Sequence, residues 1–225
     1  VLQLAPMDLT VRNQLIELLT AQGRVDEAVQ QYMDLAGIYY SLAELTLARD
    51  TYVSALRLAQ QSNTSREWPV KILTQIADID MQRIDLRQAY RIFEQLRTLE
   101  PENSEHRRHL IDLSFRTGQD SVATTELDGY LAVMENAGKR PQAIRFVEEL
   151  MAEYPERLEL RKRLADLYVR SGEIDKAVNE LDGLADMLMS RNNRAAALAI
   201  VQAIISLNPA NVEEYRSVLK ELRGG

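Results

Sequence analysis

Two histidines are the residues in this chain whose spacing could hold a metal ion. His106 and His109 lie three residues apart, and Asp112 follows after three more, so a helix would bring all three side chains to one face. Imidazole and carboxylate groups at this spacing are ligands for zinc and related ions. Arg107 and Arg108 lie between the histidines, and adjacent cations disfavour a bound dication. We therefore expect no metal and no cofactor at this position.

A charge pattern in the same region recurs 54 residues later (162 − 108 = 54). One interpretation is a basic stripe that binds a carboxylate-bearing peptide of a partner, because guanidinium groups pair with carboxylates. The alternative, which the pattern favours, is a solvated helix face with weak ion pairs between residues one turn apart. The candidate partner-binding residues are Arg108, His109, Asp112 and Arg116 in the first copy and Lys162, Arg163, Asp166 and Arg170 in the second.

The tetrapeptide Glu-Leu-Asp-Gly occurs twice, at Glu126–Gly129 and Glu180–Gly183. Its side chains could suit a metal ion or a phosphate group. A glycine inside a helix costs about 1 kcal/mol relative to alanine, so it needs a compensating role. Close packing between helices is the role that the pattern favours.

Trp68 lies in the stretch Ser62–Pro69, which has the composition of a linker. An exposed tryptophan can anchor a bound protein. More often such a residue packs against the following helix, which we expect to begin after Pro69. The sequence therefore favours packing over partner binding at Trp68.

The composition of the chain argues against several classes of function. The 225 residues carry a net charge of −7 and include no cysteine, which excludes disulfides and thiolate chemistry. An acidic protein binds nucleic acid and anionic membranes poorly, and no apolar run reaches the roughly 18 residues of a membrane span. The sequence has no glycine-rich phosphate loop, Ser-His-Asp arrangement or zinc-protease motif. We expect no enzyme, nucleic-acid binder or membrane protein, and a cytoplasmic location because no signal peptide is evident.

The elements that position these residues are predicted to be helices. Apolar residues recur at intervals of three and four, as in Leu160, Leu164, Leu167 and Tyr168, and strand-like alternation is missing. The pattern predicts about 12 helices of roughly 12 to 18 residues, with connections of roughly 2 to 5 residues. Connections this short make successive helices antiparallel neighbours. The fold class is therefore predicted to be all-α, built from helical hairpins.

An internal repeat fixes the register of these hairpins. Residues 103–156 align with residues 157–210 without a gap, with sixteen identical positions, and residues 8–61 fit the same unit more loosely. An alanine near the start of the second helix of each hairpin would let two helices cross closely. These hairpin alanines are Ala28, Ala48, Ala89, Ala123, Ala143, Ala177 and Ala197.

Each hairpin alanine is preceded by a turn, and in three hairpins it is followed by a proline that ends the helix. Five residues before the alanine, glycine supplies the positive φ that ends a helix at little cost. Asn192 is a tolerable substitute, whereas Ala43 and Ile84 are expected to turn differently. Twelve residues after the alanine, proline ends the second helix. The glycines are Gly23, Gly118, Gly138 and Gly172, and the prolines are Pro101, Pro155 and Pro209.

These residues resemble the tetratricopeptide repeat, a helical hairpin with a 34-residue period. The resemblance covers nearly the whole chain and implies a right-handed superhelical α-solenoid of antiparallel helices. It also implies an interaction scaffold whose concave groove presents residues of the first helices to a peptide or helix of a partner protein. The residues that carry it are Gln22–Val29, Leu35-Ala36-x-x-Tyr39, Leu164-Ala165-x-x-Tyr168, Gly172, Ala177, Leu181 and Pro209.

The chain departs from the regular repeat in three ways. Arg12, Arg107 and Arg161 stand where the motif has an early tryptophan, and three steps between hairpin alanines are 20 residues long instead of 34. A surplus of seven residues (41 − 34 = 7) precedes 70–103. A 20-residue step is explained if one helix, such as Val25–Tyr40, belongs to two successive hairpins. The working unit is then three helices in 54 residues.

The predicted organisation follows from these periods. Residues 1–61 form a unit preceded by the tail of a truncated repeat, and 62–69 form a linker where we expect a kink or a change of superhelical pitch across 55–75. A single repeat then spans 70–102, three-helix units span 103–156 and 157–210, and 211–225 open a further repeat.

The start of the chain is similar to the end of a repeat. Val1–Pro6 matches Leu96–Pro101 and Ile204–Pro209, the last turns of second helices. We therefore expect a fragment of a longer array, with an apolar surface near Val1–Leu4 that contacts a neighbouring molecule. The leading hypothesis is a scaffold that binds an unknown protein partner in its concave groove. The alternative is a structural or self-assembly module, as a homo-oligomer or as part of a longer repeat array in a regulator.

Overall fold

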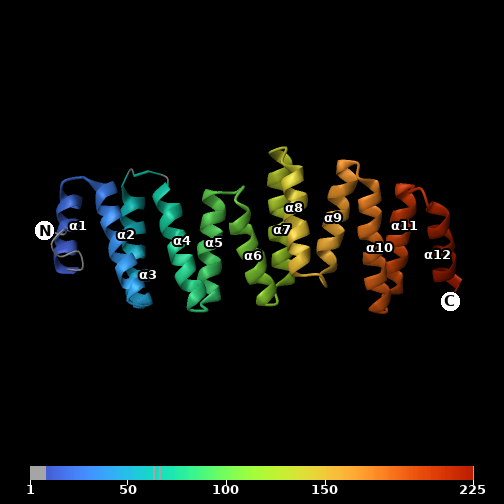
Figure 1. Cartoon of the computed structure of the whole chain (residues 1–225), viewed down its shortest axis with the longest axis horizontal. Helices are drawn as coiled ribbons and strands as arrows, with labels where there is room; N and C mark the ends of the chain where they lie inside the picture. Colours follow the sequence, from blue (N-terminus) through green and yellow to red (C-terminus); the bar gives the residue numbers. More distant parts are fainter. Residues whose placement is uncertain (1–8, 63, 66, 225) are drawn as a thin grey trace. The chain divides into compact units, whose positions relative to one another are not determined.

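The protein is described here by a computed structural model that covers residues 9–62, 64–65 and 67–224. Within these residues the chain forms twelve helices and no strand (Figure 1). Helix lengths of 13 to 17 residues and short connections confirm the predicted all-α repeat fold. The helices are α1 (Leu9–Ala21), α2 (Val25–Ser41), α3 (Leu45–Gln61), α4 (Glu67–Gln82), α5 (Leu86–Leu99), α6 (Ser104–Arg116), α7 (Asp120–Asn136), α8 (Arg140–Glu153), α9 (Leu158–Ser171), α10 (Ile174–Ser190), α11 (Arg194–Leu207) and α12 (Val212–Gly224).

The chain divides into two compact units, Val1–Ala123 and Thr124–Gly225, and the division falls within α7. In the first unit each helix from α1 to α5 packs against the next helix along the chain, and α5 packs against α6. In the second unit the same holds from α8 to α12. The predicted domain boundaries, the right-handed superhelix and the kink near residues 55–75 remain predictions.

The hairpin alanines are all completely buried, each with 0% relative exposure. In the first unit Ala48 and Ala89 belong to one apolar cluster with Tyr52 and Phe93, the large side chains that follow them by four residues. A methyl side chain at the crossing keeps neighbouring helices close, and the larger side chain one turn later fills the space beside it. The periodic alanines therefore set the packing of the hairpins, as the sequence predicts.

The seven turns before the hairpin alanines share one backbone conformation. The residue five positions before each alanine has a positive φ, including Ala43 at 60° and Ile84 at 57°. The expectation that these two residues turn differently was therefore wrong. The Ile84 N–H donates to the Met81 carbonyl at 3.1 Å, and the Asp85 N–H donates to the Asp80 carbonyl at 2.9 Å. The hydrogen bonds that satisfy the last carbonyls of the helix fix this turn and override the preference of the residue.

Helix α4 begins at Glu67, two residues before Pro69, and not after Pro69 as predicted. Proline is tolerated in a first turn because its missing N–H has no partner there. The Trp68 indole N–H donates to the Asp26 carboxylate on α2 at 2.8 Å, and the partly buried ring packs against the apolar cluster of the first unit. Packing is therefore the role of Trp68 that the structure supports.

Arginines occupy the positions where the repeat has tryptophan, and their side chains contact the next helix. Arg12 Nη1 donates to Gln31 Oε1 at 3.0 Å and lies 3.5 Å from Asp34 Oδ2. Arg161 Nη1 donates to Glu180 Oε2 at 2.7 Å. A Cβ at Gly183 would lie 3.1 Å from Arg161 Nη1. Close packing is thus confirmed as the role of the glycine in the second Glu-Leu-Asp-Gly segment.

A buried ion pair that the sequence analysis missed joins α3 and α4. Arg49 donates from Nε to Asp80 Oδ1 at 2.6 Å and from Nη2 to Oδ2 at 2.9 Å. The Asp80 side chain is 1% exposed and the Arg49 side chain 21% exposed. A carboxylate this deeply buried depends on its partner, because an unpaired buried charge is strongly destabilising.

Among the described helices, none combines the length and apolar character that a membrane crossing requires. The apolar surface expected near Val1–Leu4 lies outside the described residues.

Candidate functional site

The second copy of the charged stripe lies on α9 and is paired with carboxylates of α7. Arg163 donates from Nε and Nη2 to the two carboxylate oxygens of Asp128, both at 2.9 Å. Arg170 Nη1 donates to Glu135 Oε2 at 2.7 Å. These hydrogen bonds raise the pKa of both guanidinium groups, with Asp128 and Glu135 as the first cause for Arg163 and Arg170 respectively. The two arginines therefore hold α9 against α7.

The surface between these helices is a groove of about 390 Å³. Its apolar part is formed by Leu131 and Leu167, which are 8% and 3% exposed. The two ion pairs join the helices on either side of this apolar part, and their residues are seven positions apart on each helix (135 − 128 = 7 and 170 − 163 = 7). We call this surface the α7–α9 groove; it is lined by Asp128, Leu131, Ala132, Glu135, Lys162, Arg163, Asp166, Leu167 and Arg170.

Two charged side chains of the α7–α9 groove are left for a ligand. Lys162 and Asp166 are exposed and lie one helical turn apart on α9. Within the described part of the chain, neither side chain forms a hydrogen bond or an ion pair within 4.0 Å. The groove thus offers one cation and one anion above an apolar surface. Asp166 is thus the anion of the groove and one of the residues that the sequence pattern singled out.

The first copy of the stripe, on α6, has a different environment. Arg116 Nη1 lies 3.4 Å from Asp112 Oδ2, one turn away on the same helix, which is the spacing of the ion pairs expected on a solvated helix face. His109 stacks on Phe93 of α5, with ring centroids 4.3 Å apart and an interplanar angle of 18°. Arg108 is half-buried and has interaction partners of its own. In this copy Arg116 pairs within α6 and His109 stacks on a ring of α5.

Burial controls the protonation of His109. Removal from water lowers the pKa of its imidazole, while the nearby carboxylates of Glu105, Asp112 and Asp78 oppose that shift. The same partial burial raises the pKa of Asp78, and His109 opposes that rise. His109 thus favours its neutral form, which suits a ring stacked on phenylalanine.

His106 has a partner of its own in Glu100. Its Nε2 lies 2.9 Å from Glu100 Oε2, and the histidine side chain is 9% exposed. The Glu100 pKa is lowered, first by a hydrogen bond from Asn103 and then by His106. Among the described residues, no group of three or more His, Cys, Asp or Glu side chains is arranged to hold a metal ion.

The eight predicted residues thus divide evenly between the two units, four on α6 and four on α9. The structure brings Arg163 and Arg170 together with Asp128 and Glu135, which the sequence analysis did not propose as site residues. Both pairs are separated by 35 residues. A search for opposite charges about one repeat length apart would have found them.

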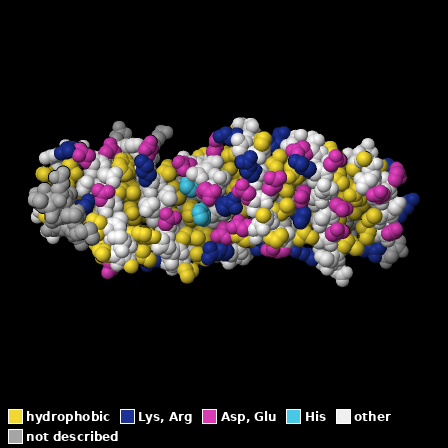
Figure 2. Space-filling view, viewed as in Figure 1, with side chains coloured by type: hydrophobic (Ala, Val, Ile, Leu, Met, Phe, Trp, Pro, Cys, Tyr) yellow, Lys and Arg dark blue, Asp and Glu magenta, His cyan; other side chains and the backbone are white. Residues whose placement is uncertain are grey.

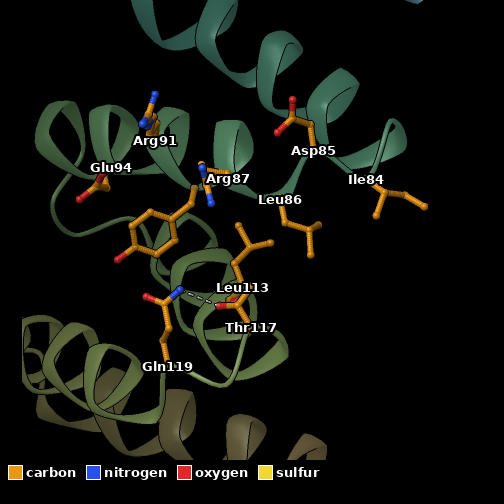
Figure 3. A pocket seen from close by; sticks show the side chains of 10 residues that line it. Ile84, Asp85, Leu86, Arg87, Arg91, Glu94, Leu113, Thr117 and Gln119 are labelled. Atoms are coloured by element: carbon orange, nitrogen blue, oxygen red, sulfur yellow. Dashed lines mark hydrogen bonds between the residues drawn. The ribbon is translucent and has the colours of Figure 1, made fainter.

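A second cavity, of about 670 Å³, lies in the first unit between the start of α5 and the end of α6. Figure 3 shows Leu86 and Leu113 pointing into this space and Ile84 at its outer edge. Thr117 donates its hydroxyl to the Leu113 carbonyl at 2.8 Å, and the Gln119 amide donates to Thr117 Oγ1 at 3.2 Å. These bonds fix the wall on the α6 side. We call this cavity the Ile84 pocket, lined by Ile84, Asp85, Leu86, Arg87, Tyr90, Arg91, Glu94, Leu113, Thr117 and Gln119.

Paired helices, buried hairpin alanines and a shared turn place the protein in the class of α-helical repeat proteins. Two family models match the sequence: the soluble NSF attachment protein, SNAP, over residues 9–139 and the tetratricopeptide repeat over residues 135–187. The first covers 131 of 225 residues (139 − 9 + 1 = 131), which is more than half. The chain therefore belongs to the SNAP family, and its repeats are of the tetratricopeptide superfamily. No curated protein matches the sequence significantly.

Solved structures with the same type of repeat resemble the chain weakly. A tetratricopeptide repeat protein from Parabacteroides merdae is 15% identical, with 96% of this chain and 98% of that chain covered and a TM-score of 0.39. BtubC (BKLC) from P. vanneervenii is also 15% identical, with 95% and 89% covered and a TM-score of 0.43. YrrB, described as having an unusual peptide-binding site, is 15% identical, with 87% and 93% covered and a TM-score of 0.38. Sequence identities and TM-scores this low do not allow a function of these proteins to be assigned to this chain.

Proposed function

We propose that the chain is a protein-interaction scaffold that binds a peptide or a helix of a partner protein in the α7–α9 groove. The observation that carries the proposal is the pair of exposed charges, Lys162 and Asp166, which form no hydrogen bond or ion pair within 4.0 Å among the described residues and lie beside Leu131 and Leu167. A few placed polar groups above an apolar surface are typical of a recognition site.

The ion pairs of the groove support this role. Because Arg163 and Arg170 are already bound to Asp128 and Glu135, both side chains keep their positions without a ligand. A preformed groove loses less conformational entropy on binding than a flexible one. The arginines therefore shape the groove, and Lys162 and Asp166 provide its polar recognition.

The superfamily supports a role as an interaction scaffold. Tetratricopeptide repeat proteins are generally scaffolds without catalytic activity, and the SNAP family takes its name from attachment to another protein. A repeat array suits this work because each repeat contacts only its neighbours, which leaves a long surface for partners.

Peptide display tests the proposal. Peptides selected on the purified chain are expected to bind a Lys162→Glu/Asp166→Lys variant about tenfold or more weakly, because the swap keeps the net charge but reverses both contacts. The matched control is a Lys220→Glu/Glu221→Lys swap on α12, where both side chains are exposed. Peptides that bind the wild type and the swapped variant equally well would place recognition elsewhere.

The self-assembly hypothesis predicts a different result. Light scattering would then show a homo-oligomer, and selected peptides would not compete with its formation. A monomer that binds selected peptides through Lys162 and Asp166 supports the scaffold instead.

A further inference from the structure

The turn between α4 and α5 departs from the six equivalent turns of the chain. Ile84 has a φ of 57° and is 74% exposed. A β-branched residue is disfavoured in this left-handed conformation, and an exposed isoleucine gains little from burial. Strained residues of this kind cluster at functional sites. Its equivalents are small or polar, namely Gly23, Ala43, Gly118, Gly138, Gly172 and Asn192.

The helix that follows carries a pair of arginines that the other repeats lack. Arg87 and Arg91 lie one turn apart on α5 and are exposed. Equivalent positions in the other hairpins hold a single basic residue, Arg145, and never two. The equivalents of Arg87 are Asp26, Thr46, Ser121, Pro141, Asp175 and Ala195, and those of Arg91 are Gln30, Asp50, Thr125, Arg145, Asn179 and Ala199.

These two arginines have no internal partner, whereas the neighbouring carboxylates do. Across the described part of the chain, neither the Arg87 side chain nor the Arg91 side chain forms a hydrogen bond or an ion pair. Asp85 accepts a hydrogen bond from the Gln88 N–H at 3.2 Å as the N-cap of α5. Glu94 Oε1 lies 3.9 Å from Arg97 Nη2. The pocket wall on α5 therefore presents two guanidinium groups without a side-chain partner, and the Asp85 and Glu94 carboxylates of the same wall already have contacts on α5.

Apolar surface adjoins this charge. Leu86 and Leu113 form the inner part of the Ile84 pocket, and Leu113 is only 1% exposed. Two large exposed residues, Leu42 at 55% and Leu47 at 47%, belong to the turn between α2 and α3 and the first turn of α3. Figure 2 shows hydrophobic side chains along the edge where the α2–α3 and α4–α5 turns lie.

We propose that the Ile84 pocket binds an acidic amphipathic helix of a partner protein. Two carboxylates one turn apart on that helix pair with Arg87 and Arg91, since helix neighbours at this spacing have Cβ atoms about 5–6 Å apart on both partners. A large apolar side chain of the same helix enters the pocket against Leu86, Leu113 and Ile84. This site is independent of the α7–α9 groove, because all its residues belong to the first unit.

The test uses two peptide display libraries on the full chain. One fixes glutamate at two positions a turn apart with a leucine between them, and the other has lysine in place of both glutamates. The glutamate library is expected to yield binders and the lysine library none. By fluorescence anisotropy, the Kd of a recovered peptide is expected to rise about tenfold or more in Arg87→Glu/Arg91→Glu. It is expected to rise several-fold in Ile84→Gly, which keeps the turn but removes the apolar side chain.

Matched controls separate this site from general charge effects. Arg57→Glu/Arg145→Glu changes the net charge equally at two exposed arginines and should leave the Kd unchanged, as should Lys162→Glu/Asp166→Lys in the α7–α9 groove. If charge reversal disturbs folding, Arg87→Gln/Arg91→Gln replaces it, because this variant removes both charges without adding new ones. Circular dichroism checks that it folds, and the Kd of the peptide is again expected to rise.

Four results would overturn the proposal. They are equal enrichment from both libraries, an unchanged Kd in the arginine variants, displacement of the peptide by a short single-stranded oligonucleotide at equal concentration, and a dimer that arginine reversal dissociates. The third would show a general anion site, and the fourth would make a second copy of this chain the occupant.

Discussion

The α7–α9 groove and the Ile84 pocket use arginine in opposite ways. In the groove, Arg163 and Arg170 are bound to carboxylates of the neighbouring helix at 2.7–2.9 Å. In the pocket, Arg87 and Arg91 have no such partner among the described residues. Arginine thus joins two helices in one unit and has no side-chain partner in the other. An arginine-rich surface therefore has to be interpreted from its partners and not from its composition.

The largest effect is expected where arginine pairing is most deeply buried. Arg49→Met leaves the Asp80 carboxylate, 1% exposed, without a partner and is expected to lower the free energy of unfolding by about 3–5 kcal/mol. Urea unfolding followed by circular dichroism measures the loss. Asp80→Leu in the same background should recover a large part of it, because the buried charge is then gone. A loss below about 1 kcal/mol would show that the ion pair is not a structural anchor.

The next largest change in stability is expected from the backbone strain at Ile84. Ile84→Gly is expected to raise the free energy of unfolding by about 1 kcal/mol, since glycine adopts the positive φ without strain. The reverse change in the second unit, Gly172→Ile, should destabilise by about 1–2 kcal/mol. Thermal melts of both variants measure the difference. If Ile84→Gly lowers the melting temperature, the isoleucine contributes to the fold and not to binding.

The comparison itself is tested by removing one arginine from each region. Arg163→Ala is expected to lower the free energy of unfolding by about 0.5–1 kcal/mol. A double-mutant cycle with Asp128→Ala should assign most of this loss to the coupling between the two side chains. Arg87→Ala removes no internal partner and should stay within about 0.5 kcal/mol of the wild type. Equal losses of unfolding free energy in Arg163→Ala and Arg87→Ala would contradict the division into paired and unpaired arginines.

The smallest effect concerns pH. His109 and Arg163 are equivalent in the repeat (109 + 54 = 163), but only His109 titrates near neutrality. Its folded-state pKa is lowered by burial, so the unfolded state binds more protons. Stability is therefore full above the ordinary histidine pKa of about 6.5 and falls as the pH drops through it. His109→Gln should flatten this part of the profile of melting temperature against pH, while Arg163→Gln should leave it unchanged.

The sequence predicted the fold because its periodic signals are local. The hairpin alanines and Pro101, Pro155 and Pro209 act within one or two helical turns, and the helices end two residues before each proline. The turns at Ala43 and Ile84 were predicted wrongly because residue preference was weighed without the hydrogen bonds that close the helix. Those bonds depend on the length of the connection, which is three residues at Ala43 and Ile84, as it is at Gly23, Gly118 and Gly138.

The sites were harder to predict because pairing between helices is not local. The predicted stripe lies on α9, and the α7 partners of its two arginines lie 35 residues earlier in the sequence. Arg49 and Asp80 are 31 residues apart, with no motif to connect them. Arg87 and Arg91 were overlooked because their importance comes from missing partners, which only the positions of all neighbouring side chains reveal.

The arginine that replaces tryptophan has a consequence for how these repeats evolve. Arg12 is followed by neutral Gln31 and charged Asp34, whereas Arg161 is followed by charged Glu180 and neutral Gly183, at the same distances of 19 and 22 residues along the chain. Each arginine thus keeps one carboxylate, at either of two positions. Related sequences should therefore show these three positions covarying: a carboxylate gained at one of the two later positions should accompany its loss at the other, and both should become free to vary where the arginine reverts to tryptophan.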